Sequence, residues 1–181
     1  MRFLKAFLFG ATGLFIIITL FSLLIPFKVR VSRALLINGT TAGEVYRQVA
    51  AIENWKKWHP VFTADSAKLF VQPPSAGQKD SIYKILQLGK EITISFIPAN
   101  ASSVKFLLQA KGENDIENDL FITPLSGQQA VQVEWRAITR LHWYPWEKFY
   151  GIFIDKLTGP GYEAALQALK MYLENTPAPA G

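Results

Sequence analysis

A stretch of 22 consecutive uncharged residues, from Ala6 to Phe27, constrains this chain more than any other feature. Most of these residues are apolar, and as a helix with a rise of about 1.5 Å per residue they would span roughly 33 Å, close to the hydrocarbon thickness of a bilayer. A cleavable signal peptide would have an apolar region of about 7 to 15 residues that ends in small residues. This stretch is longer and ends in Ile25-Pro26-Phe27-Lys28. The sequence therefore favours an uncleaved membrane anchor over residues 1–27.

Positive charge gathers around this stretch and is balanced elsewhere. Five of the 19 Lys and Arg residues lie within the first 33 positions, and no acidic residue precedes Glu44. Residues 34–181 then carry 14 basic and 14 acidic residues. A protein that binds a phosphate backbone would carry positive charge over its body. We therefore expect a lipid bilayer, and no nucleic acid, as a partner.

The orientation of the anchor is left open by its flanking charges. Arg2 and Lys5 precede the apolar stretch, and Lys28, Arg30 and Arg33 follow it. Because the positive-inside comparison is close to balanced, it does not place the body on either side. We expect a single-pass protein of the cell membrane with the side of its body undetermined.

The reactive side chains are few. The chain has no cysteine and two histidines, which excludes disulfide scaffolds, cysteine nucleophiles and a three-histidine metal site. It also lacks the G-x-S-x-G, H-E-x-x-H and P-loop motifs. The alternating acids from Glu113 to Asp119 lack the glycine and glutamate of a calcium loop and indicate a solvated strand face. We therefore expect no metal and no cofactor.

The body begins with a strand and two short helices. Residues 29–37 predict the strand, which Asn38-Gly39 ends. Thr41 and Glu44 have the spacing of a capping box, so a helix is expected over about residues 42–51. A second short helix would run through Trp55 and Trp58 and end at Pro60.

A meander of strands and one long helix follow. Short connections between the strands predict an antiparallel sheet, and the alternation is clearest in the last strand, around Val131–Ala137. The other strands are expected at residues 68–72, 81–88, 91–97, 104–110 and 117–123. Apolar residues at helical spacing over residues 162–173 predict a closing helix, which Gly159-Pro160-Gly161 should separate from the aromatic segment before it. The tail, residues 176–181, is expected to be disordered.

Two segments of the body resemble a known superfamily. The strand VSRALLIN, followed by GTTAGEVYRQVAAIENWKKWHP with Trp55, Trp58 and Pro60, resembles the opening of START-like proteins, also called SRPBCC or Bet v 1-like. The segment GPGYEAALQALK at residues 159–170 is similar to the closing helix of bacterial members of the polyketide cyclase/dehydrase and lipid-transport-like group. The resemblance covers residues 29–175. The middle of the chain, SIYKILQLGKEITISF, departs from it, because the tryptophans and glycine-rich turns of that group are missing.

The resemblance implies an α+β fold of the helix-grip type. In such a fold a curved antiparallel sheet, here of about six to seven strands, wraps around the long C-terminal helix and leaves a cavity between them. We therefore expect residues 28–175 to form one START-like domain behind the anchor. Large side chains should line its cavity, and the candidates are Trp55, Trp58, Tyr83, Phe96, Phe106, Trp135, Trp146, Phe153 and Leu166.

Three functions remain open. The first is a non-catalytic, monomeric, membrane-anchored domain that binds a hydrophobic small molecule or lipid, with Tyr83, Arg136 or His59 orienting a polar group. The second is a cyclase-, dehydratase- or hydrolase-type enzyme that uses His59 or His142. No carboxylate has an obvious position to orient either histidine, so both are expected to be exposed or helix-capping residues. The third is a protein-interaction module with a closed cavity.

Overall fold

The computed structural model describes residues 2–63, 67–71, 82–87, 89–97, 100 and 102–176, and for residues 67–71 the backbone alone. The sequence also predicts a turn at residues 73–77 between two of the strands. This turn lies outside the described ranges, and so does the tail after Thr176. The elements are, in order, α1 (Arg2–Ser22), β1 (Lys28–Asn38), α2 (Ala42–Ala50), α3 (Ile52–Trp55), α4 (Pro60–Thr63), β2 (Ala67–Val71), β3 (Ile82–Gln87), β4 (Lys90–Ile97), β5 (Ser103–Ala110), β6 (Ile116–Pro124), β7 (Ala130–Arg140), α5 (Pro145–Gly151) and α6 (Ile154–Asn175).

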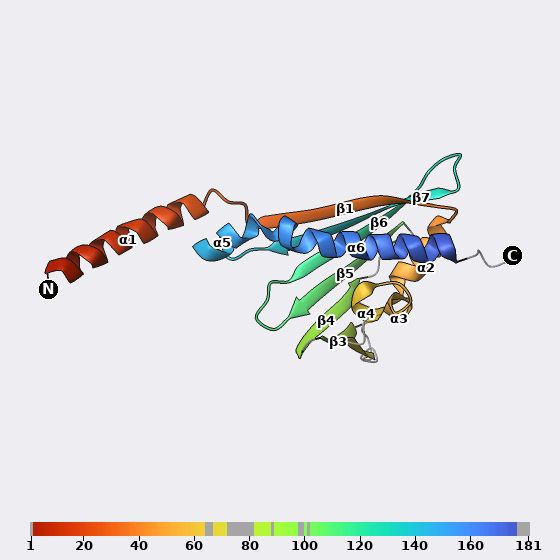
Figure 1. The fold of residues 1–181 in the computed structure, drawn as a ribbon, viewed down its shortest axis with the longest axis horizontal. Helices are drawn as coiled ribbons and strands as arrows, with labels where there is room; N and C mark the ends of the chain where they lie inside the picture. Colours follow the sequence, from red (N-terminus) through yellow and green to blue (C-terminus); the bar gives the residue numbers. More distant parts are fainter. Residues whose placement is uncertain are drawn as a thin grey trace.

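The strands form one antiparallel sheet of seven, in the order β1-β7-β6-β5-β4-β3-β2. The first strand of the chain therefore pairs with the last, and β2 forms the opposite edge. Figure 1 shows α6 lying along one face of this curved sheet, with α2, α3 and α4 beside its C-terminal half. The expected α+β helix-grip fold is confirmed.

The alternation in β7 places one row of side chains in the core. Val131, Val133 and Trp135 are buried, whereas Gln132 and Arg136 point to the other face. The register pairs Trp135 with Leu120 of β6, and on the neighbouring strands it pairs Phe96 with Phe106. The largest core side chains thus gather on the face that α6 covers.

The helix α2 begins as the sequence predicts. The side chain of Thr41 accepts a hydrogen bond from the Glu44 N–H, and the Glu44 carboxylate accepts one from the Thr41 N–H at 2.8 Å. This capping box satisfies two of the free amide groups of the first turn. Pro60 ends the turn that follows α3, but it also begins a third short helix, α4, which was not expected.

The expected break at Gly159-Pro160-Gly161 is wrong, because α6 runs through all three residues. Proline removes one helical hydrogen bond and normally ends or kinks a helix. Here the helix is held by contacts with β1 before and after the proline. The Arg33 guanidinium bonds to Asp155 and lies against Gly159, and near the other end of the helix the Asn38 N–H donates to the Glu174 carboxylate. Tertiary contacts therefore outweigh the local signal.

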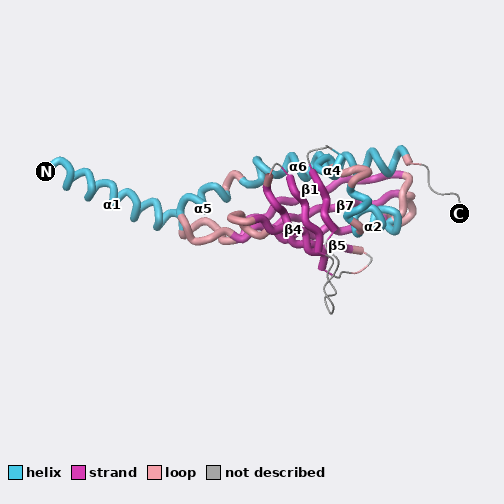
Figure 2. The backbone as a smooth tube through the Cα atoms, turned by 90° about the horizontal axis from the view of Figure 1, so that it is seen from below, coloured by secondary structure: helices cyan, strands magenta, loops and turns pink. Residues whose placement is uncertain are grey.

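The helix α1 projects away from the domain (Figure 2). It is long and apolar enough to cross a membrane, and of its residues Arg2–Ser22 only the last one, Ser22, is buried. In this respect it differs from the core helix of a globular protein, in which such a stretch is mostly buried.

Candidate ligand-binding cavity

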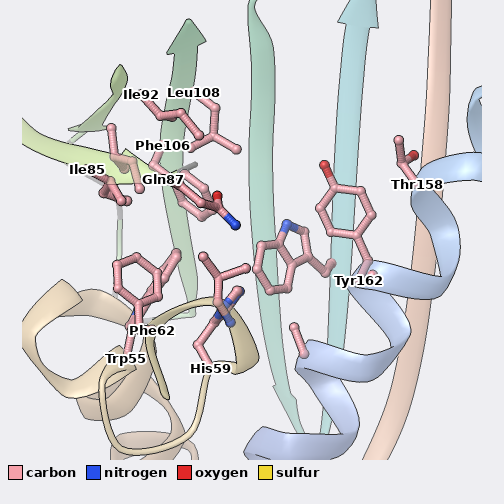
Figure 3. Close-up of a pocket in the computed structure, with 15 residues that line it drawn as sticks. Trp55, His59, Phe62, Ile85, Gln87, Ile92, Phe106, Leu108, Thr158 and Tyr162 are labelled. Atoms are coloured by element: carbon pink, nitrogen blue, oxygen red, sulfur yellow. The ribbon is translucent and has the colours of Figure 1, made fainter. Parts of the chain in front are cut away.

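A cavity of about 260 Å³ lies between α6, the α3–α4 turn and the strands β3, β4, β5 and β7 (Figure 3). Its walls are mainly aromatic and aliphatic. The lining residues are Trp55, His59, Val61, Phe62, Ile85, Gln87, Ile92, Ile94, Phe106, Leu108, Trp135, Thr158, Gly161, Tyr162 and Ala165.

Trp55 occupies the centre of the aromatic wall. Its ring stacks on the His59 imidazole at a centroid distance of 5.2 Å and meets Phe106 edge-on at 5.3 Å. Its indole N–H donates to the Val49 carbonyl at 3.0 Å, so its one polar atom is satisfied inside the core. Ring contacts and one hydrogen bond therefore hold the wall on the side of α3.

A buried asparagine positions Trp135 on the opposite side. The indole N–H of Trp135 donates to Asn118 Oδ1 at 2.9 Å, and Asn118 Nδ2 donates to the Ile116 carbonyl at 3.0 Å. Asn118 lies on the neighbouring strand β6 and is almost completely buried. Sequence reasoning did not find this residue, because it lies between acids in a segment that was expected to be solvated.

His59 lines the cavity and also caps the first turn of α4, so the helix-capping alternative of its expected environments is confirmed. Its Nδ1 accepts a hydrogen bond from the Val61 N–H at 3.3 Å. Burial lowers the pKa of His59 to about 4, because the charged imidazole loses its hydration. At neutral pH the proton therefore lies on Nε2, which makes this atom a hydrogen-bond donor.

Tyr162 supplies a second uncharged polar group, from α6. Its ring meets Trp135 at a centroid distance of 5.2 Å. Burial raises the pKa of Tyr162 to about 12, so its hydroxyl is protonated at physiological pH. Within the part of the chain that the structure describes, this hydroxyl has no hydrogen-bond partner and the lining includes no carboxylate. The cavity thus offers neutral donors and acceptors in an apolar setting.

The candidate residues are distributed over three environments. Trp55, Phe106 and Trp135 line the cavity. Four others lie in the core next to it without being part of its lining, and these are Trp58, Tyr83, Phe96 and Leu166. Trp146 and Phe153 are exposed and lie outside the cavity, because the chain leaves the sheet after β7 and carries them to the end near α1.

Two other polar candidates also lie outside the cavity. Arg136 bonds to Glu134 through two nitrogens, and its guanidinium lies 4.4 Å from the centre of the Phe121 ring. His142 is exposed, as expected, and its Nδ1 is 3.1 Å from the Glu147 carboxylate. Neither residue reaches the lining.

Several lining residues were not on the candidate list, although the sequence carried a signal for some of them. Ile92 and Leu108 belong to the same alternating rows as Phe96 and Phe106. Tyr162 lies on the apolar stripe of the closing helix. No local pattern marks Gln87 or Thr158, which reach the cavity only through the arrangement of β3 and α6.

The curved sheet and α6 form a helix-grip fold, which this chain shares with START-like proteins of known structure. A START superfamily protein from Mycobacterium smegmatis is 18% identical and superposes with a TM-score of 0.62, covering 81% of this chain and 97% of that one. The ZhuI aromatase/cyclase from Streptomyces sp. R1128 is 14% identical with a TM-score of 0.63, covering 85% of this chain and 98% of that one. Truncated norcoclaurine synthase from Thalictrum flavum is 13% identical with a TM-score of 0.59, covering 83% of this chain and 96% of that one. Identities this low establish the fold alone.

The sequence itself has no such match. No protein-family model matches the chain, and no curated protein sequence shows significant similarity to it.

Proposed function

We propose that this chain is a membrane-anchored START-like domain that binds an uncharged hydrophobic small molecule or lipid and performs no catalysis. In this proposal residues 1–27 are the anchor and residues 28–175 are the binding domain. The observation that carries it is the apolar cavity of about 260 Å³, whose polar lining groups include the neutral side chains of His59 and Tyr162. This volume is close to the lower end of the range of about 300–1,000 Å³ for small-molecule sites.

The walls of the cavity support an uncharged ligand. Transferring an ion into such surroundings costs several kcal/mol unless an opposite charge meets it. The described lining offers no charged partner. A single hydroxyl or carbonyl on the ligand could instead bond to His59 Nε2 or to the Tyr162 hydroxyl. The remaining ligand surface would be buried against rings and aliphatic chains, at about 25 cal/mol per Å².

An acid–base enzyme is the second candidate, because His59 and Tyr162 line the same cavity. General acid–base catalysis works best when the pKa of the catalytic group lies near the working pH. A histidine with a pKa of about 4 is a weak base, and its Nδ1 is bonded to a backbone N–H rather than to a carboxylate. These properties favour binding over catalysis.

The anchor suits such a cargo. A hydrophobic molecule partitions into the bilayer, so a domain tethered by α1 would meet its ligand at high local concentration. The same reasoning applies whichever side of the membrane the domain occupies.

The test is extraction of the purified full chain with organic solvent, followed by mass spectrometry. Lipids that surround α1 would also be extracted, so two variants that place a large ring in the cavity, Leu108→Trp and Ile92→Trp, provide the comparison. Leu36→Trp, at an exposed position of β1, is the matched control. We expect one apolar molecule that the wild type and Leu36→Trp carry and that both cavity variants lose. Identical extracts from all four folded proteins would overturn the proposal.

A further inference from the structure

The helix α5 is apolar on the outside and carries a lysine on the inside. Trp146 is 64% exposed and Tyr150 is 54% exposed, whereas Lys148 is completely buried. A helix that packs on a globular domain in water normally buries its apolar face and exposes its charges. The orientation of α5 is the reverse. Its outer face is therefore suited to apolar surroundings rather than to water.

Exposed apolar side chains also precede and follow α5 in the sequence. Large apolar side chains follow one another over residues 143–157 and are exposed. We call this group the aromatic collar, and it consists of Trp143, Tyr144, Trp146, Tyr150, Phe153 and Leu157. Tryptophan and tyrosine are the residues enriched at the two interfaces of a membrane, where their rings lie at the level of the lipid headgroups.

The collar continues directly from the end of α1. The Lys148 ammonium donates to the Ile25 carbonyl at 2.9 Å and lies 3.1 Å from the centre of the Phe27 ring. Ser22, the last residue of α1, is completely buried. Figures 1 and 2 both show α5 between α1 and the sheet. A bilayer that holds α1 therefore has its surface next to the collar.

Exposed basic side chains lie beside the collar. Lys28, Arg30 and Lys156 are exposed at this end of the molecule. The nearby acids are engaged within the protein, since Glu147 accepts hydrogen bonds from His142 and Asn114 and since Asp155 bonds to Arg33. Each basic side chain near an anionic lipid surface contributes about 1 kcal/mol to attraction. The charge distribution complements lipid headgroups.

We propose that the aromatic collar is a second membrane-binding surface, which lies in the headgroup region of the bilayer that α1 crosses and holds the domain against it. This inference rests on the proposed anchoring by α1. It also sets the position of the cavity, because Thr158 is one of its lining residues and follows Phe153 by five positions, about 7.5 Å of helix. The collar would thus keep this end of the cavity close to the lipid from which the ligand comes.

The absence of cysteine makes the proposal directly testable by site-directed spin labelling. The full chain carries one label at a time, in the variants Trp146→Cys, Tyr150→Cys and Phe153→Cys, in vesicles of phosphatidylcholine and phosphatidylglycerol. Met171→Cys is the matched control, because Met171 is 59% exposed at the far end of α6. Ile16→Cys reports on α1 itself. The measurement compares label accessibility to oxygen, which concentrates in lipid, with accessibility to a water-soluble nickel chelate.

We expect the oxygen-to-nickel ratio to be several-fold higher at the three collar positions than at position 171, and highest at position 16. If position 16 lies in lipid while the collar labels behave like the label at 171, the collar proposal is overturned and the anchor stands. If position 16 is itself accessible to nickel, the anchor fails and the collar proposal fails with it. The collar labels could instead be shielded from both reagents, with spectra broadened by the label of a neighbouring molecule. This result would mean that another copy of the chain covers the collar, and it also overturns the proposal.

Discussion

The guanidinium of Arg33 on the edge strand β1 donates two hydrogen bonds to the carboxylate of Asp155 in the first turn of α6, at 2.9 and 3.2 Å. The same guanidinium lies against Gly159, one turn further along the helix. These contacts join residues 122 positions apart in the sequence. They attach the first turns of α6 to the sheet before Pro160, and the hydrogen bond from the Asn38 N–H to the Glu174 carboxylate attaches the helix after it. This is why the helix continues where its local sequence predicts an end.

Alanine substitutions at the two glycines beside Pro160 should therefore have opposite effects. A methyl group at Gly159 would meet the Arg33 guanidinium and displace it from Asp155, whereas one at Gly161 meets nothing within 4 Å. We expect Gly159→Ala to lower the free energy of unfolding by about 1–2 kcal/mol. Gly161→Ala should raise it by about 0.5–1 kcal/mol, because alanine favours a helix. Urea denaturation of the full chain in detergent measures both. Equal effects would contradict this account of α6.

Replacing Trp55 should cost far more stability than replacing Trp146. Trp55 is 2% exposed, contacts several aromatic rings and bonds to Val49, so Trp55→Ala leaves a large void. We expect a loss of about 3–5 kcal/mol. Trp146→Ala removes the same side chain from an exposed position and should change the free energy of unfolding in detergent by about 0.5 kcal/mol or less. Unfolding midpoints that fall equally would show that Trp55 does not hold the wall of the cavity.

The burial of His59 predicts a dependence of stability on pH. Its pKa is about 4 in the folded chain, against 6.5 for an exposed histidine, so between these values the unfolded chain binds a proton that the folded chain does not. Stability from this group is therefore complete above pH 6.5 and falls by about 3 kcal/mol as the pH decreases to 4.

The variant His59→Asn isolates this contribution. We expect its free energy of unfolding to vary less between pH 6.5 and pH 4 than that of the wild type, by about 3 kcal/mol. His142→Asn is the matched control, because His142 is exposed, and it should keep most of the wild-type slope. If His59→Asn retains the full slope, the histidine is not buried in its neutral form.

The hydroxyl of Tyr162 should contribute to ligand affinity and not to the shape of the cavity. Tyr162→Phe keeps the ring against Trp135 and removes only the oxygen, so a ligand loses one hydrogen bond. With 1-naphthol as an uncharged probe, we expect affinity to fall about threefold to tenfold. Tyr172→Phe, on the same helix and outside the cavity, should bind the probe like the wild type. Calorimetric titration, corrected for the probe taken up by detergent, measures the difference, and equal affinities would exclude Tyr162 as a ligand contact.

The order of the elements could be predicted because each one carries its own periodic signal. The capping box of Thr41 and Glu44, the alternation around Val133 and the apolar stripe of the closing helix are local patterns, and each corresponds to an observed element. Most of the cavity lining could not be predicted in this way, and of the nine candidate lining residues only Trp55, Phe106 and Trp135 line it. Sequence reasoning treats a large ring as a core residue, and for Trp146 this fails because α5 lies beside α1 instead of over the sheet.

By itself the sequence determined an apolar helix of membrane length and the order of the strands and helices behind it, because hydropathy and periodicity are properties of neighbouring residues. The helix-grip arrangement of these elements was expected only from the resemblance to START-like proteins. Only the tertiary structure decided which side chains enclose the cavity and which face outward. His59, Gln87 and Tyr162 come from a turn, a strand and a helix and meet only after the sheet has curved around α6. Lys148 likewise becomes buried only because the end of α1 packs against α5. Contacts between residues this far apart in the chain depend on packing and leave no local pattern in the sequence.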